Sequence, residues 1–167
     1  MPFYSYDYER LNRAVSRLRE ERWKKHSPIA CFRTADDTGE VGAQPPAVFE
    51  SGELCIGDSW SGYDRYLWLD AMVEVPQDFT GSLWGRFDFG LTGGGGNSGF
   101  ESLLYVDGHP YQGVDQNHQD VPFHARPGQK LHLQFRLWSG LVGGGRPHPN
   151  DHKIKRAELA ILDENVD

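Results

Sequence analysis

Apolar and polar residues alternate along four stretches of the chain, which is the pattern of strands with one buried face. In residues 65–75 the odd-numbered positions from Leu67 to Val75 are apolar, and the even-numbered positions are mixed or polar. The same alternation occurs in 82–89, 130–137 and 156–161. Because no helical periodicity separates these stretches, we expect antiparallel sheets, and their apolar faces need a second layer to cover them. The pattern predicts an all-β fold, an antiparallel β-sandwich of jelly-roll or galactose-binding-like type.

The N-terminal segment has a helical period instead. Apolar residues recur there at steps of three and four between charged residues, at Tyr8, Leu11, Val15 and Leu18. This spacing predicts one amphipathic helix of about five turns. Ser5 and Asp7 are candidate caps, and the many basic residues of its second half favour a helix C-terminus that Ser27-Pro28 ends. We expect one face to pack on the sandwich or on a neighbouring domain, although a basic helix that binds a partner is an alternative.

Residues 29–46 give weaker signals and are interpreted as a connector. A short strand is expected at 29–32, and the residues that follow are turn formers and prolines.

A polar stretch after the next strand is the main candidate site. Residues 101–106 are predicted as a short buried strand that stops at Asp107-Gly108, a dipeptide suited to a turn with positive φ. The predicted loop 109–120 then gathers hydrogen-bonding side chains, namely Tyr111, Gln112, Asp115, Gln116, Asn117, His118 and Asp120. Polar groups on a loop held by a rigid strand often form a binding surface, and an ordinary solvated loop is the alternative.

The residues from Gly99 to His118 also resemble a known family pattern. They read G-x-E-x-L-x-Y-V-D-G-x-P-Y-Q-G-x-D-x-N-H, which is similar to a motif of the N-terminal β-sandwich domain of family 38 glycoside hydrolases, the intracellular-type α-mannosidases. The similarity runs from about Gly57 to Glu164 and includes the last predicted strand, and it is weak before Gly57. Two glycine runs, 93–96 and 143–145, depart from the family pattern.

The resemblance implies a division of the chain and a set of partners. Residues 1–45 would be the N-terminal helix and connector, 46–163 the β-sandwich domain, and 164–167 the start of a linker to an absent catalytic domain. The family's zinc ion and aspartate nucleophile belong to that catalytic domain, so no cofactor and no catalytic residue are expected in this chain. The implied partners are the catalytic domain of the same chain and an α-mannoside or oligosaccharide substrate.

Two groups of side chains are candidates for contacts in such a protein. Tyr111, Gln112, Asp115, Asn117 and His118 are expected to line the substrate cleft. Trp60, Trp68, Trp84 and Trp138 are candidates for a domain interface or for stacking on sugars. The second role suits a rival hypothesis, a self-sufficient carbohydrate-binding module, and a third hypothesis is a domain that drives homo-oligomer formation.

Composition limits which binding partners and which cellular location are expected for this chain. The 167 residues fit one domain, and the net charge of −7 gives no general attraction to nucleic acid or anionic lipid. Neither a membrane-spanning apolar run nor a secretory signal is recognisable, so a cytoplasmic location is expected. Cys31 and Cys55 form no metal motif or disulfide framework, and both are predicted to be reduced, buried thiols.

Other site chemistries find little support. The glycine run 93–96 lacks the Lys-Ser or Lys-Thr of a phosphate loop and is interpreted as a hairpin connection. The histidines at 109, 118, 124 and 132 have no zinc-site spacing, and residues 115–120 lack the glycine and glutamate of a calcium loop, so no metal is assigned. Glycoside hydrolysis usually needs two carboxylates. Of the candidates Glu101, Asp107 and Asp115, only Asp115 is expected to reach a substrate.

Overall fold

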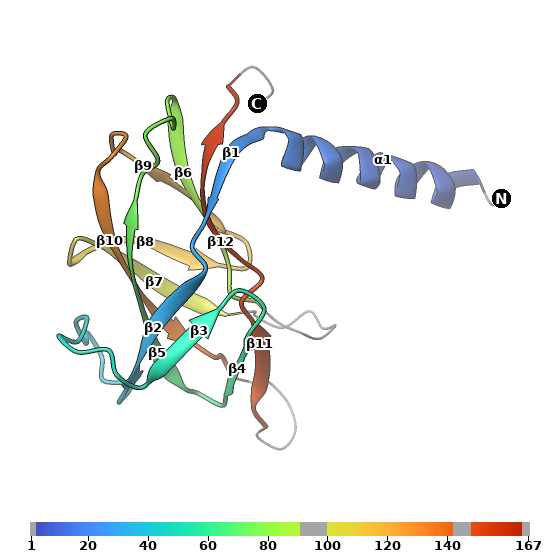
Figure 1. The fold of residues 1–167 in the computed structure, drawn as a ribbon. Coiled ribbons are helices and arrows are strands. Elements are labelled where there is room, and N and C mark those ends of the chain that lie inside the picture. Colours follow the sequence, from blue (N-terminus) through green and yellow to red (C-terminus); the bar gives the residue numbers. More distant parts are fainter. Residues whose placement is uncertain (1–2, 91–99, 142–147, 165–167) are drawn as a thin grey trace.

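Two antiparallel sheets pack face to face in the computed structural model, which describes residues 3–90, 100–141 and 148–164 (Figure 1). One N-terminal helix precedes them, α1 (Phe3–Glu21). The strands are β1 (Trp23–Pro28), β2 (Cys31–Asp37), β3 (Gly52–Cys55), β4 (Ser59–Gly62), β5 (Tyr66–Glu74), β6 (Ser82–Asp88), β7 (Glu101–Val106), β8 (His109–Asp115), β9 (Asp120–Phe123), β10 (Lys130–Trp138), β11 (Asn150–Lys153) and β12 (Arg156–Leu162). The predicted all-β sandwich with one N-terminal helix is confirmed.

The strand order shows how distant parts of the chain meet. A four-stranded sheet has the order β1-β12-β6-β9, and a six-stranded sheet has the order β3-β2-β5-β10-β7-β8. A small third sheet pairs β11 with β4. The long strands β5 and β10 lie side by side at the centre of the six-stranded sheet, with Leu69 opposite Phe135.

The core lies between the two main sheets, on the face that the alternation predicted. Odd-numbered residues of β5 and β10 are buried there, including Leu67, Leu69, Val73, Leu133 and Phe135. Phe135 is fully buried and meets the rings of Phe32, Phe87 and Phe89, with ring centres 4.7–5.9 Å apart. Because side chains alternate across a strand, the even-numbered residues of β5 and β10 form the outer face of this sheet.

The helix ends earlier than the sequence indicated. It stops at Glu21, and β1 begins at Trp23, so the prediction that Ser27-Pro28 ends the helix was wrong. The reason is long-range: Trp23 pairs with Leu162 and buries its ring against Trp84, with ring centres 5.9 Å apart. The next strand, β2, continues past the predicted 29–32 strand to Asp37 and pairs with β5. Sheet pairing therefore begins within the segment that was interpreted as helix and connector.

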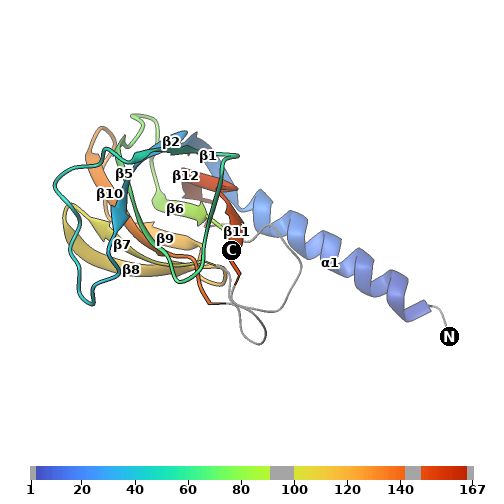
Figure 2. The same cartoon turned by 90° about the horizontal axis from the view of Figure 1, so that it is seen from below.

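The apolar stripe of α1 does not pack on the sandwich. The helix extends away from the two sheets in both views (Figures 1 and 2). We call Tyr8, Leu11, Val15 and Leu18 the α1 stripe; these side chains are 66 %, 61 %, 38 % and 56 % exposed. Of the two packing arrangements expected from the sequence, contact with this chain's own sandwich is not observed.

The two cysteines form a disulfide, so the prediction of reduced, buried thiols was wrong. Cys31 of β2 stands directly opposite Cys55 of β3, with Cα atoms 3.9 Å apart, and both residues are half-buried. The pairing of β2 with β3 brings together two residues that are 24 positions apart, which no sequence spacing indicates.

Several predictions concern residues outside the described part of the chain. The glycine run 93–96 lies in the undescribed segment 91–99, and the run 143–145 lies in the undescribed segment 142–147. Residues 165–167, which are most of the expected linker, are also undescribed. Among the described residues, no helix has the length and apolarity needed to cross a membrane.

Candidate functional site

The predicted polar loop 109–120 is mostly two strands. Residues 109–115 form β8, the edge strand of the six-stranded sheet, and residues 120–123 form β9, the edge strand of the four-stranded sheet. The prediction of a continuous loop was therefore wrong. Val114 is the only fully buried residue of β8, so this strand shows no apolar alternation. The turn before it is as predicted, because Asp107 and Gly108 have φ values of +51° and +80°.

Tyr111 and Gln112 join β8 to β9. The hydroxyl of Tyr111 donates a hydrogen bond of 2.6 Å to the carbonyl of Pro122. The amide of Gln112 donates one of 3.4 Å to the carbonyl of Asp120. The ring of Tyr111 also lies 5.8 Å from that of Phe123. These two predicted cleft residues thus hold the two sheet edges together.

Asp115 organises the bend between β8 and β9. Its Oδ1 accepts hydrogen bonds from the amides of Asn117 and His118, at 2.7 and 2.8 Å, and lies 3.0 Å from Nδ1 of His118. Burial acts to raise the pKa of Asp115, but these hydrogen bonds outweigh it and hold the pKa below its ordinary value. Asn117 and His118 are exposed, as is Tyr111, whereas Gln112 and Asp115 are half-buried.

Two of the four candidate tryptophans are buried within the chain itself. Trp60 is 4 % exposed, donates to the carbonyl of Phe89 and stacks on His152 at 4.2 Å. Trp68 is 2 % exposed and packs with Phe49 and Tyr105, so it does not lie at an exposed strand position. Neither ring has a face that a sugar reaches in this structure.

Trp84 and Trp138 remain half-buried, on the outer faces of different sheets. Trp84 donates to Ser82 on the four-stranded sheet. Trp138 donates to Asp64 at 2.8 Å and lies on the six-stranded sheet.

One row of side chains on the outer face of the six-stranded sheet combines both predicted groups. Strand register places Tyr66 opposite Trp138, Trp138 opposite Glu101, and Glu101 opposite Asp115. We call these four residues the outer-face row. At about 4.8 Å between neighbouring strands, the row spans roughly 14 Å across β5, β10, β7 and β8. It presents an aromatic pair beside two carboxylates, which is a combination suited to the ring faces and hydroxyl groups of a sugar.

A buried ion pair, Arg136 with Asp37, lies against Tyr66 at the aromatic end of the row. Arg136 donates from Nε to Asp37 at 2.6 Å and from Nη2 at 3.1 Å, and its guanidinium lies 4.8 Å from the ring centre of Tyr66. The hydrogen bonds that Arg136 donates to the Asp37 carboxylate raise the pKa of Arg136. Burial acts to raise the pKa of Asp37, but hydrogen bonds from Arg136 and the amide of Gly39 outweigh it and lower that pKa. Tyr66 in turn stacks on Trp138, with ring centres 6.4 Å apart.

A second polar cluster on the same face was missed by sequence reasoning. Asp70 is 2 % exposed and accepts hydrogen bonds from Arg33, His132 and Gln134. An open cavity of about 450 Å³ lies beside it, lined in part by Arg33 and Glu53. The sequence feature that could have revealed the cluster is Asp70 itself, a carboxylate in the middle of the largely apolar strand β5. Arg33, His132 and Gln134 all bond Asp70, so the cluster links β2, β5 and β10 on the outer face of the sheet.

Comparison with known proteins finds relatives of the fold only. No protein-family model matches the chain, and no curated protein matches it. A solved β-glucuronidase of Faecalibacterium prausnitzii has TM-score 0.58 and 11 % identity over 84 % of this chain and 32 % of its own. A Ruminococcus gnavus β-glucuronidase in complex with D-glucaro-δ-lactam has TM-score 0.52 and 12 % identity over 85 % and 30 %. A further crystal structure of the Ruminococcus gnavus β-glucuronidase has TM-score 0.51 and 13 % identity over 83 % of this chain and 29 % of its own.

These similarities show that the fold of this chain resembles part of each of these β-glucuronidases. The chain spans about a third of the length of the solved structures it matches, and the shared identity is low enough to show the fold alone. The solved structures are β-glucuronidases, so they give no support to the α-mannosidase family that the motif resembles.

Proposed function

We propose that this chain is a non-catalytic β-sandwich domain of a glycoside-hydrolase-type protein, and that it packs against a further domain of that protein. The observation that carries the proposal is its fold, which matches about a third of the β-glucuronidase of Faecalibacterium prausnitzii and leaves the remainder of that chain unmatched. A domain of this size within a larger enzyme needs a surface that it shares with its neighbours.

The α1 stripe is the surface proposed to meet that further domain. Its exposed side chains follow one face of a 19-residue helix that stands clear of the sandwich. A contiguous apolar face on an otherwise charged helix is typical of an interaction surface. The opposite face carries ion pairs within the helix, such as Arg13 with Glu9, and these leave the stripe as the side that gains most from burial.

The carboxylates of the outer-face row do not form a hydrolytic pair in this proposal. Glu101 and Asp115 are opposite each other on neighbouring strands, and such positions have Cβ atoms about 4.5–5.5 Å apart. Two carboxyl groups on such positions are able to approach the roughly 5–5.5 Å separation of the carboxyl groups in retaining glycosidases. Glu101 is exposed on an open sheet face, however, where water is not excluded from the reaction. The carboxylate of Asp115 is occupied by the hydrogen bonds of its own turn.

The finer assignment, an α-mannosidase N-terminal domain, rests on the motif alone. Several motif residues have structural roles that suffice to explain them: Asp107-Gly108 makes the β7–β8 turn, and Tyr111 and Gln112 join β8 to β9. An α-mannoside remains the proposed substrate class of the whole protein, with zinc in its catalytic domain and a cytoplasmic location.

The packing proposal predicts a difference between the isolated chain and the longest natural polypeptide that contains it. Leu11→Ser with Leu18→Ser should change the unfolding free energy of the isolated chain by less than about 0.5 kcal/mol, because both side chains are exposed. In the longer polypeptide the same pair should lower the unfolding midpoint by about 2–4 °C, measured by calorimetry. Arg13→Ser, on the opposite face, is the control. Equal midpoints for all three proteins would show that the stripe contacts no further domain.

A second candidate function, carbohydrate binding by the isolated chain, is favoured by the outer-face row. We expect the chain to bind neutral sugars such as mannose and mannobiose with a dissociation constant of about 1 mM, equivalent to roughly −4 kcal/mol. Glucuronic acid should bind more weakly, because its carboxylate would face Glu101 and Asp115. Trp138→Ala should abolish binding in an NMR titration, since it removes one of the two rings of the row.

The matched control is Trp84→Ala, which removes a half-buried tryptophan from the other sheet. It should leave sugar binding unchanged. A wild-type chain that shows no shifts at high millimolar sugar would exclude the binding module and leave the packing role alone.

A further inference from the structure

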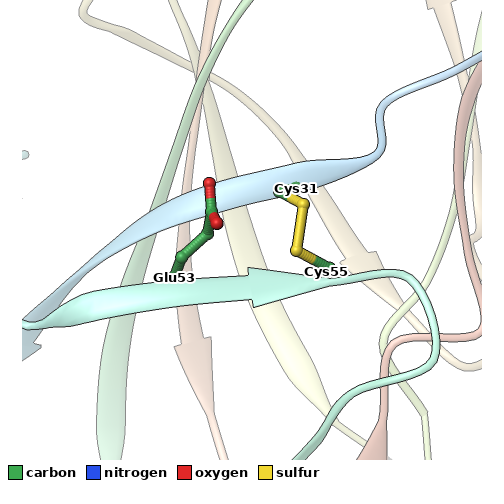
Figure 3. A group of neighbouring side chains, drawn as sticks. All are labelled: Cys31, Glu53 and Cys55. Carbon is green, nitrogen blue, oxygen red and sulfur yellow. A yellow bond between two sulfur atoms is a disulfide. The ribbon is translucent and has the colours of Figure 1, made fainter.

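Three side chains that are able to bind a metal meet where β2 and β3 pair at the edge of the six-stranded sheet (Figure 3). Cys31 and Cys55 stand directly opposite each other. Glu53 lies two residues before Cys55 on β3, so its side chain emerges on the same face. One ligand atom from each of the three residues lies within 4.8 Å of the other two.

Main-chain pairing holds the two cysteines opposite each other in addition to the disulfide. The amide of Ile56 donates to the carbonyl of Ala30 at 2.8 Å, next to the cysteine pair. Cys31 and Cys55 therefore occupy a non-hydrogen-bonded position of the antiparallel pair, where opposite side chains are closest. Four consecutive residue pairs, from Cys31–Cys55 to Thr34–Gly52, hold this register through main-chain pairing.

The site is open to small molecules. Both cysteines are half-buried and Glu53 is exposed. Cys31 and Glu53 line the open cavity of about 450 Å³ described above. An exposed disulfide is more easily reduced than a buried one, because a thiolate reaches its sulfur atoms.

We propose that Cys31, Cys55 and Glu53 form a zinc site when a dithiol has reduced the disulfide. Two thiolates and one carboxylate are a donor set that Zn²⁺ accepts, with a water molecule as the fourth ligand of a tetrahedral site. Zinc–sulfur bonds of about 2.3 Å place two ligating sulfur atoms roughly 3.8 Å apart, which opposite positions on paired strands allow. Mg²⁺ and Ca²⁺, which prefer oxygen ligands, are excluded by the two sulfur atoms.

The chemical steps balance without any further reactant. A dithiol transfers two electrons and two protons to the Cys31–Cys55 disulfide, giving two protein thiols and the oxidised, cyclic disulfide of the reductant. Zn²⁺ then binds both sulfur atoms as thiolates and releases the two thiol protons to solvent. In the reverse step the cyclic disulfide of the reductant is the oxidant: it accepts two electrons from the two thiolates and two protons from solvent, the Cys31–Cys55 bond re-forms, and Zn²⁺ is released. The site then alternates between a covalent and a metal-bound link across β2 and β3.

Arg33 is the cation that faces this site from β2, directly opposite Glu53. Its guanidinium is bonded to Asp70 through Nε at 3.0 Å and also through Nη2, so its charge is compensated within the sheet. The carboxylate of Glu53 is therefore available as a metal ligand in this proposal.

The experiment is a Co²⁺ titration of the chain in both redox states, because Co²⁺ replaces Zn²⁺ and its thiolate complexes absorb in the near ultraviolet. The chain is reduced with dithiothreitol, freed of it under anaerobic conditions, and titrated. We expect one equivalent of Co²⁺ per reduced chain, displaced by Zn²⁺, and no thiolate band for the oxidised chain. A reduced chain that binds no more Co²⁺ than the oxidised chain would overturn the proposal.

Two variants assign the ligands. Glu53→Gln should weaken binding by about tenfold or more, since even residues that only support metal ligands contribute 10–100-fold. Glu50→Gln changes an exposed carboxylate three residues away and should bind as the wild type does. Equal affinities for the two variants would remove Glu53 from the site. If reduction unfolds the chain, Zn²⁺ should restore its far-ultraviolet circular dichroism, and failure to do so contradicts the proposal.

Discussion

Arg86→Ala is expected to lower the free energy of unfolding by about 3–5 kcal/mol. The side chain of Arg86 is only 4 % exposed on the outer face of the four-stranded sheet. It forms ion pairs with Glu158 at 3.1 Å, with Asp120 at 3.5 Å and with Glu20 at 3.1 Å. Alanine would leave these three carboxylates close together without their shared cation. Urea unfolding followed by tryptophan fluorescence measures the loss.

The same variant should loosen the attachment of α1. Glu20 is the last-turn residue of α1 that reaches Arg86, and Arg22 pairs with Asp120 at 3.1 Å just after the helix. Burial acts to raise the pKa of Glu20, but the charges of Arg86 and Arg156 outweigh it and lower that pKa. Hydrogen exchange in residues 18–22 should therefore rise in Arg86→Ala before the sandwich unfolds.

Arg156→Ala is the matched control for this prediction. Arg156 also pairs with Glu20, at 3.4 Å, but its side chain is 30 % exposed and its partner is 60 % exposed. An ion pair in such a position contributes about 0–1 kcal/mol. If the two arginine variants lost the same small amount of stability, burial would not be what makes Arg86 important.

The strands with one buried face were predictable because the cause of their pattern is local. Alternation in residues 65–75 and 130–137 identified β5 and β10, and the same parity told which residues enter the core. A period of two is imposed by the backbone of each strand, so it requires no knowledge of its partner.

The parts that failed depend on partners far along the chain. The end of α1 is set by Trp23, which pairs with Leu162 at the other end of the sequence. The disulfide depends on the pairing of β3 with β2, which brings together cysteines 24 residues apart in the sequence. The β8 strand has an edge position with little burial, so its residues carry no alternation and resemble a loop. Local pattern cannot anticipate contacts that only the assembled sheets create.

The candidate site shows the same division between local and assembled features. Trp138 and Asp115 were selected as separate candidates, and strand register places them in one row with Glu101 between them. Tyr66 was not selected, because its role comes from its position opposite Trp138 and above Arg136. Parity alone predicted that residues 66 and 138 lie on outward positions of their strands, but not that the strands are neighbours.

Asp37→Ala is expected to cost about 3–5 kcal/mol and to disorder the aromatic end of the outer-face row. The carboxylate of Asp37 is 2 % exposed and its partner Arg136 is 14 % exposed, so alanine leaves a nearly buried guanidinium without its counter-charge. Because Arg136 lies against Tyr66, the variant should also shift the fluorescence or NMR signals of Trp138, which stacks on that tyrosine. Urea unfolding at neutral pH measures the loss of unfolding free energy.

The stability difference between wild type and Asp37→Ala depends on pH, because the pKa of Asp37 shifts on folding. Its pKa is lower in the folded chain than in the unfolded chain, where a value of about 3.9 applies. The ion pair therefore stabilises the fold above that pH, and its contribution is lost as the pH falls through the folded value. The difference in unfolding free energy between wild type and Asp37→Ala should therefore shrink in acid.

Asp36→Ala is the control. The Asp36 side chain is 71 % exposed and pairs with the half-exposed Arg65, so the expected loss of unfolding free energy is below about 1 kcal/mol. A gap for Asp37→Ala that stays constant from neutral pH to pH 3 would show that packing around Asp37, and not its charge, supports the row.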